Sequence, residues 1–297
     1  MPAPTGPPPK AMLCAIIPAM TLAQDLLSDL QTAFAGRAVP RVKALHSPPV
    51  PWNGSKDGEF GALELESGAI GLSYLLLDDA LSTIAGAADA VQGADPLALA
   101  AGWADPSASP ARAALGFAAV NALTRELFDR AGYVPPMATD SIGGIEPAAG
   151  ESIGMVGFFP PLVKQVTAQG ARLTVLELRA DLVGTHPGFT VTLDPQALSG
   201  CTQVLSTSTV LLNHTLDAVL AACRGARRLV LIGPSAGCLP DTLFARGVTA
   251  LGGVWITDAR AFTAALSTGA PWGGATRKTL LERQAWPGLA ALRQRVG

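Results

Sequence analysis

Glycines, prolines and polar side chains gather in three short stretches of an otherwise apolar chain. The first is "IGMVGFFPPLVKQV" (residues 153–166), the second is "STSTVLLNHT" (206–215) and the third is "LIGPSAGCLP" (231–240). Each stretch follows or ends a run of apolar residues and leads into a helical pattern. If the apolar runs are parallel strands, these loops converge at one edge of a sheet, where ligands bind. Together the three stretches predict a ligand-binding site.

The first stretch matches a nucleotide-binding turn only in part. Gly154 and Gly157 end the apolar run, and Pro160 and Pro161 open the helix, where a missing N–H costs nothing. The remaining free amides of the helix could face an anion. The pattern is G-x-x-G-x-x-P-P, however, instead of G-x-G-x-x-G, and the ring of Phe158 would crowd a pyrophosphate. The stretch therefore favours a tight turn beside a smaller or different ligand.

Glu177 ends the next apolar run, "TVLELR". A dinucleotide-binding fold places an acid there, about 20 residues after the glycines, on the ribose hydroxyls. The alternative is a carboxylate that caps a loop or pairs with Arg179. The residues alone leave both interpretations open.

The other two stretches offer hydroxyl, amide and imidazole groups. These groups can bind an oxyanion, a metal or a hydroxylated ligand, and they can also simply cap a helix. A nucleophilic serine is not supported, because Ser235 lacks the G-x-S-x-G context. We take His214 as the candidate metal ligand. The candidate ligand-binding residues of these loops are Ser206, Thr207, Thr209, Asn213, Gly233, Pro234 and Ser235.

The chain has three histidines and four cysteines, without C-x-x-C or H-x-x-x-H spacing. The sequence therefore predicts no high-affinity structural zinc site. Scattered cysteines in an apolar setting are typically buried small hydrophobes, and a reducing cytoplasm suits them. A preformed transition-metal chelate, held by hydroxyls, amides and Glu177, fits this composition better than a bare ion.

These loops must be positioned by the elements around them. From residue 153 onward, apolar strand patterns and helical patterns alternate strictly, which predicts a Rossmann-like doubly wound parallel sheet with helices on both faces. The pattern before residue 136 is mixed, with a strong helix capped by Ser109 and opened by Pro110. We divide the chain into a proline-rich extension, disordered or non-native (1–19), a smaller α+β domain (20–135), a linker rich in Gly, Pro, Ala and Ser (136–152) and the Rossmann-like domain, which continues through "RKTLLERQAWPGLAALRQR" as one or two terminal helices (153–297).

Composition excludes several classes of protein. The 297 residues are 49% hydrophobic and 15% charged, with a net charge of -2, which argues against disorder and against nucleic-acid binding. No run is long and apolar enough for a confident membrane span. The segment "KAMLCAIIPAMTLAQ" loosely resembles a signal peptide, but its single positive charge and Pro18 argue against export. We expect a cytoplasmic protein, and the apolar composition favours a homodimer.

The motifs "GMVGFFPPLV", "LTVLEL", "STSTVLLNHTL", "LIGPSAGCLP" and "GVTALGGVWITD", in this order, resemble the heavy-metal chelation family, domain of unknown function 364. The resemblance implies a Rossmann-like fold and a link to metal or metal-chelate handling. Relatives carry a glycine after the asparagine, where this chain has His214. No family reaction follows from the resemblance.

The N-terminal half resembles the enolase-N-terminal-like domain, domain of unknown function 4213. The match is clearest in "SPARAALGFAAVNAL", which contains Arg112, Gly116 and Asn121. The barrel of enolase and its metal carboxylates are missing, so enolase chemistry is not implied.

The first functional hypothesis is binding of a metal ion or a small metal-chelating molecule between the two domains. Arg112, as a bidentate cation, and Asn121 would contribute from the N-terminal side. The alternative is an enzyme that uses a nucleotide or S-adenosylmethionine-like cofactor, with Glu177 on the ribose. A third hypothesis is a scaffold dimer whose loops bind nothing. The sequence leaves open whether the protein is an enzyme.

Overall fold

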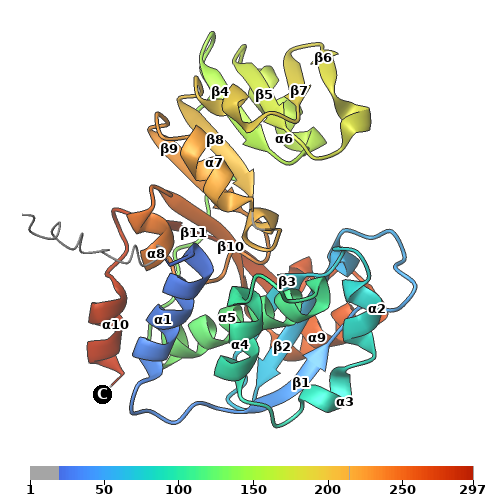
Figure 1. Ribbon diagram of the computed structural model, residues 1–297, viewed down its shortest axis with the longest axis vertical. Coiled ribbons are helices and arrows are strands. Elements are labelled where there is room, and N and C mark those ends of the chain that lie inside the picture. Colours follow the sequence, from blue (N-terminus) through green and yellow to red (C-terminus); the bar gives the residue numbers. More distant parts are fainter. Residues whose placement is uncertain (1–19, 214, 297) are drawn as a thin grey trace, which may run out of the picture.

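The computed structural model describes residues 20–213 and 215–296. The predicted extension at residues 1–19 and the candidate metal ligand His214 lie outside the described residues. Figure 1 shows two sheets, a small one in the blue N-terminal part and a large one that runs from green to red.

The large sheet has eight strands in the order β11-β10-β9-β8-β4-β5-β7-β6. The inner strands are parallel, and only the edge strands β11 and β6 are antiparallel to their neighbours. Numbered by chain order, the inner strands read 3-2-1-4-5-6 from β7 to β10, the Rossmann order, with the switch point between β4 and β8. The strands are β4 (Ser152–Val156), β5 (Arg172–Leu176), β6 (Gly184–His186), β7 (Phe189–Thr192), β8 (Gln203–Thr207), β9 (Arg228–Ile232), β10 (Ala250–Ile256) and β11 (Thr276–Glu282).

Successive side chains of these strands enter different hydrophobic clusters. In β9, Leu229 and Leu231 join one cluster and Val230 joins another. Alternate side chains of a strand point to opposite faces, so both faces of the sheet are covered. The predicted Rossmann-like, doubly wound architecture is confirmed. Helices of this half are α6 (Pro160–Thr167), α7 (Leu216–Ala222), α8 (Asp241–Ala245), α9 (Ala259–Thr268) and α10 (Leu289–Arg295), with short 3-10 turns η2 (Ala180–Leu182), η3 (Pro195–Leu198), η4 (Ser208–Leu211) and η5 (Gly273–Ala275).

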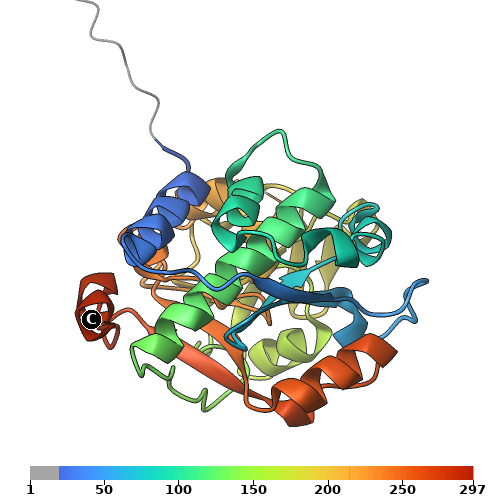
Figure 2. The ribbon, with the colours of Figure 1, turned by 90° about the horizontal axis from the view of Figure 1, so that it is seen from below.

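The small sheet is antiparallel, in the order β1-β2-β3. The long helix α5 crosses one face of it, and α9 covers the other (Figures 1 and 2). The backbone of α5 comes so close to β3 that a Cβ on Gly71 would lie 2.0 Å from the amide nitrogen of Ala122. The elements are α1 (Leu22–Phe34), β1 (Val42–His46), η1 (Asp57–Glu59), β2 (Phe60–Leu65), β3 (Ile70–Tyr74), α2 (Ala80–Ala85), α3 (Ala88–Val91), α4 (Pro96–Ala104) and α5 (Pro110–Arg130).

One hydrophobic cluster extends from the N-terminal part of the chain, which holds the small sheet, into the part that holds the large sheet. It includes Leu26 of α1 and Phe117 of α5 together with Val204 of β8 and Leu231 of β9, all fully buried. The helix α9, although late in the chain, packs on the small sheet through Phe262. The small sheet therefore packs against the rest of the molecule, with the ends of β2 and β3 beside the loops that follow the large-sheet strands.

The segment from residue 136 to 152 packs against the large sheet. Met137 forms a bridge with Thr279 of β11, and Ile142 and Ile145 are buried beside Val230 of β9. The predicted linker is therefore joined to the following sheet by backbone pairing and by buried isoleucines.

Several elements differ from the sequence-based prediction. Residues 276–282, predicted as part of a terminal helix, form the edge strand β11. There Thr279 and Leu281 are buried while Lys278 is exposed, a two-residue period that favours a half-covered edge strand. The prediction missed β2, α4 and the β6–β7 hairpin. No helix among the described residues is long and apolar enough to cross a membrane.

Candidate functional site

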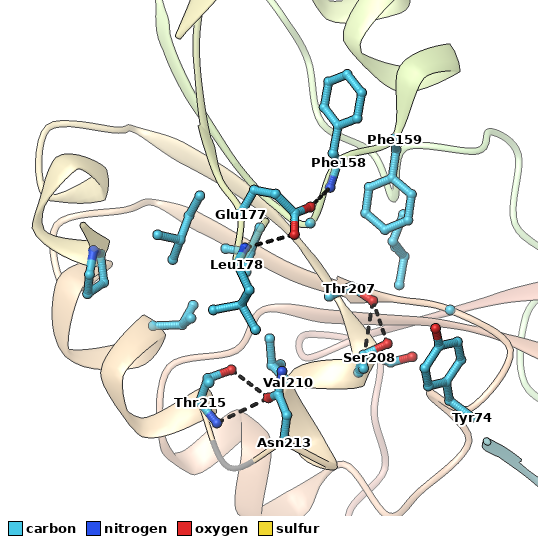
Figure 3. A pocket seen from close by; sticks show the side chains of 18 of the residues that line it. Tyr74, Phe158, Phe159, Glu177, Leu178, Thr207, Ser208, Val210, Asn213 and Thr215 are labelled. Atoms are coloured by element: carbon cyan, nitrogen blue, oxygen red, sulfur yellow. Dashed lines mark hydrogen bonds between the residues drawn. The ribbon is translucent and has the colours of Figure 1, made fainter. Parts of the chain in front are cut away.

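A cavity of about 400 Å³ lies at the carboxyl ends of β4, β5, β8 and β9, at the switch point of the sheet. The loops after these strands form most of its wall, and the small sheet contributes the rest. Figure 3 shows Phe158 and Glu177 on one side of the cavity, Asn213 and Thr215 on another, and Tyr74 nearby. The predicted residues that line it are Gly157, Phe158, Glu177, Thr207, Thr209, Asn213, Gly233 and Pro234. The structure thus brings the three loops together.

The turn after β4 is held by the carboxylate of Glu177. Its oxygens accept the backbone N–H groups of Phe158 at 2.8 Å and of Leu178 at 2.7 Å (Figure 3). They also accept the N–H of Arg179 at 3.3 Å. The Arg179 guanidinium pairs with Asp181 at 2.6 Å, not with Glu177. Glu177 could bind a ribose or cap a loop, and in this geometry its carboxylate caps the loop.

The loop after β8 is organised by its own side chains. The hydroxyl of Thr207 accepts the N–H of Thr209 at 3.2 Å and contacts its hydroxyl at 3.0 Å. The amide oxygen of Asn213 accepts the N–H of Thr215 at 3.2 Å and its hydroxyl at 2.6 Å. These bonds present hydroxyl and amide groups to the cavity in a defined arrangement (Figure 3).

The loops after β8 and β9 touch through two buried serines. The hydroxyls of Ser208 and Ser235 lie 3.0 Å apart, and Ser235 is fully buried. Gly233, with a φ of +149°, passes so close that a Cβ there would lie 2.2 Å from the Ser208 hydroxyl. Ser235 therefore fastens one loop to the other and does not line the cavity.

Three more predicted residues support the cavity from outside its wall. Gly154 lies within β4, where a Cβ would be 3.0 Å from both Leu198 and Val204. Ser206 is fully buried and donates to the carbonyl of Thr207 at 3.2 Å. Pro160 opens α6.

Arg112 and Asn121 do not contact the cavity. The Arg112 guanidinium is largely exposed and pairs with Asp105 at 3.0 Å. The Asn121 amide is buried and donates to the carbonyls of Leu72 at 2.6 Å and Ser235 at 2.9 Å. Asn121 thus ties α5 to β3 and to the β9 loop. Contrary to expectation, neither side chain lines the cavity, because Arg112 pairs with Asp105 at the surface and the Asn121 amide is already bonded to two backbone carbonyls.

The N-terminal contribution comes instead from Glu59, Phe60 and Tyr74 at the ends of β2 and β3. Burial raises the pKa of the Glu59 carboxyl, and Asp57 adds to the rise while Lys56 opposes it. Burial, together with the charge of Glu59, raises the pKa of the Tyr74 phenol. Glu59 is not among the candidate residues drawn from the sequence, because nothing local indicates which side of the small sheet faces the strand ends.

The described residues do not suit a bare heavy-metal ion. Residues 20–213 and 215–296 contain no group of three or more His, Cys, Asp or Glu side chains arranged to hold a metal. Burial raises the pKa of Cys223 and Cys238 to about 12, and neither thiol lines the cavity. Heavy metals prefer thiolate or imidazole ligands, whereas the described cavity wall offers hydroxyls, an amide and two separate carboxylates.

The fold and the cavity define a Rossmann-like α/β protein with a ligand-sized site at its switch point. Residues 143–283 match the model of the family DUF364, described as "Putative heavy-metal chelation". The matched residues contain the whole large sheet and the strand-end loops after β4, β5, β8 and β9.

Two solved structures share the fold. A DUF364 protein of unknown function from Pyrococcus horikoshii has a TM-score of 0.64 at 18% identity, over 88% of this chain and 100% of that one. Another from Desulfitobacterium hafniense has a TM-score of 0.62 at 21% identity, over 88% of this chain and 99% of that one. No curated protein matches the chain.

Proposed function

We propose that the switch-point cavity binds a small metal-chelating molecule, free or as its metal complex. The main observation behind this proposal is the set of side-chain groups that line the cavity. Its described wall presents hydroxyls, an amide and aromatic rings suited to an organic ligand, without the side-chain cluster that would hold a bare ion. The family description supports the link to metals.

The size of the cavity suits such a ligand. Its volume of about 400 Å³ falls in the range of sites for small organic molecules. Most of the lining residues are apolar, and the hydroxyls of Thr207 and Thr209 with the amide of Asn213 stand among them as orienting groups. A metal would enter as part of the ligand, coordinated mainly by the ligand's own donors.

The second candidate is an enzyme that uses a nucleotide or S-adenosylmethionine-like cofactor. The Rossmann strand order and the position of Glu177 at the end of the second strand favour it. Against it, the Glu177 carboxylate already accepts three backbone N–H groups. A ribose would therefore compete with the turn for the same oxygens.

The test is native mass spectrometry of the gently purified protein, with elemental analysis of the same sample. We expect a stoichiometric metal-bearing adduct that is lost in Asn213→Ala and in Thr209→Val. Thr263→Val, whose hydroxyl bonds the Ala259 carbonyl within α9 and lies outside the cavity wall, is the matched control and should keep the adduct. A nucleoside-type mass would instead support the enzyme. A clean protein mass that persists after incubation with metal chelates and adenosine cofactors would contradict both.

The enolase-like nature of the N-terminal unit, residues 20–135, stays a prediction, as do the homodimer and the cytoplasmic location. Through its small-sheet residues Glu59 and Tyr74, that unit would form one wall of the binding site under either proposal.

A further inference from the structure

The described part of the cavity wall is acidic. Its described residues include the carboxylates Glu59 and Glu177 but no Lys, Arg or His. The basic residues whose charge acts on these carboxylates are Lys56 and Arg179. Both side chains are exposed outside the wall, and Arg179 already pairs with Asp181. Burial raises the pKa of Glu59, Asp57 adds to the rise, and Lys56 offsets it only in part.

Two N–H groups of the anion-binding turn of the dinucleotide fold are already bonded within this chain. In that fold, the free N–H groups of the first strand–helix turn and the helix N-terminus hold a pyrophosphate. Here the N–H of Gly157 bonds the Leu176 carbonyl at 2.9 Å, and the N–H of Phe158 bonds the Glu177 carboxylate at 2.8 Å. The helix then opens with Pro160 and Pro161, which have no N–H. The chain's own carboxylate thus takes the place of a bound anion.

Aromatic rings form much of the remaining wall. Phe60 and Tyr74 pack edge to face with ring centres 5.7 Å apart, beside Glu59. Across the cavity, Phe158 is stacked on Phe189 at 6.0 Å. Aromatic faces attract cations and accommodate apolar ligand bodies, and they give nothing to an anion.

We infer that the cavity selects organic ligands that carry a positive charge next to an apolar body, and that it rejects phosphates and carboxylates. Glu59 is the residue that faces the charge of the ligand, and the rings of Phe60, Tyr74 and Phe158 enclose its body. Amine-bearing chelators and cationic metal complexes belong to this class. The inference rests on the proposed function, because it concerns the same cavity. It adds the charge of the ligand to that proposal.

The test compares two probes of similar size and opposite charge, 2-phenylethylammonium and 3-phenylpropanoate, by calorimetry on the full chain. We expect the ammonium to bind at least about tenfold more tightly than the carboxylate. Glu59→Gln, which removes the charge and keeps the shape, should weaken ammonium binding about tenfold. Glu66→Gln, an exposed residue beyond β2, is the matched control and should leave both affinities unchanged. Thermal melts of each variant establish that it is folded.

Equal or tighter binding of 3-phenylpropanoate, an unchanged ammonium affinity in Glu59→Gln, or no binding of either probe would each overturn the inference. Nickel complexes of triethylenetetramine and of ethylenediaminetetraacetate, which are cationic and anionic, separate it from the proposed function. Preferential binding of the anionic complex would keep the chelate function and overturn the charge selection. Binding of 2-phenylethylammonium without binding of either complex would support the charge selection and contradict the chelate function.

Discussion

Glu177 shows how one carboxylate can determine what a Rossmann-like turn is able to hold. By accepting the N–H of Phe158, it stabilises the turn after β4 and uses a donor that a phosphate would need, while the N–H groups of Leu178 and Arg179 tie it to the loop after β5. The same residue type at the same position serves nucleotide binding in other proteins of this architecture. This chain differs from those proteins in the two prolines at the start of α6 and in the backbone N–H groups that the Glu177 carboxylate accepts.

At Gly233, the absence of a side chain decides whether two loops can meet. We expect Gly233→Ala to reduce the free energy of unfolding by about 1–3 kcal/mol, because the new methyl group would lie 2.2 Å from the Ser208 hydroxyl. Gly184→Ala is the matched control, since Gly184 has the same φ of +149° and open space around it. Urea denaturation of both variants measures the difference.

The double variant Gly233→Ala with Ser208→Ala should recover part of the lost stability, because the closest atom is removed. Equal losses in Gly233→Ala and Gly184→Ala would mean that backbone conformation, and not contact with Ser208, explains the effect.

At the scale of elements, the pairing of β1 with β2 places two basic side chains on the buried carboxylate of Glu64. Glu64 accepts hydrogen bonds from Lys43 at 2.7 Å and His46 at 2.8 Å. Burial alone would raise the pKa of Glu64, but the hydrogen bonds and charges of Lys43 and His46 outweigh it and hold the pKa below its ordinary value. The cluster therefore links the stability of the small sheet to pH.

The pH dependence has a definite sign. Since the folded pKa of Glu64 is depressed, its ionisation stabilises the fold above the unfolded pKa, about 4.3, and this contribution is lost as pH falls through the folded pKa. We expect wild type to exceed Glu64→Gln in unfolding free energy at pH 7, and the gap to shrink progressively below about pH 4.3. Urea denaturation across this range measures the gap. A gap of the same size at pH 7 and at pH 3 would contradict the assignment.

The elements also show which local patterns are reliable. The helix from Pro110 was predictable because its cap, its proline and its apolar spacing are all local. The strand β11 was not, because "TRKTLLE" is too short for its two-residue period to exclude a helix, and its strand conformation depends on pairing with β10. The hairpin β6–β7 likewise depends on an edge, that of β5.

At the scale of the whole molecule, the two sheets share one hydrophobic cluster and a buried hydrogen bond between distant segments. The indole N–H of Trp103, on α4, donates to the carbonyl of Leu211 at 2.7 Å, beside the loop that lines the cavity. Removal of a buried partner leaves a carbonyl unsatisfied. This contact is therefore a test of how strongly the N-terminal half supports the site.

We expect Trp103→Phe to lower the free energy of unfolding by about 1–3 kcal/mol, from the unsatisfied Leu211 carbonyl and the smaller ring. Far-UV circular dichroism and fluorescence of the remaining tryptophans should still report one coincident transition, because the core is continuous. Two separate transitions in wild type would contradict a shared core. Trp52→Phe, on an exposed loop, is the control and should change stability little.

The sequence by itself determined the alternation of strands and helices after residue 153, the Rossmann-like class and the three loops that meet at the cavity. These follow from local hydrophobic periods, caps and turn residues, which act over a few residues of chain. Only the tertiary structure decided that Glu59 and Tyr74, not Arg112 and Asn121, complete the wall, and that Glu177 closes its own turn. Those outcomes depend on which distant elements approach one another and which hydrogen-bond partner each group finds there, and no local pattern encodes either.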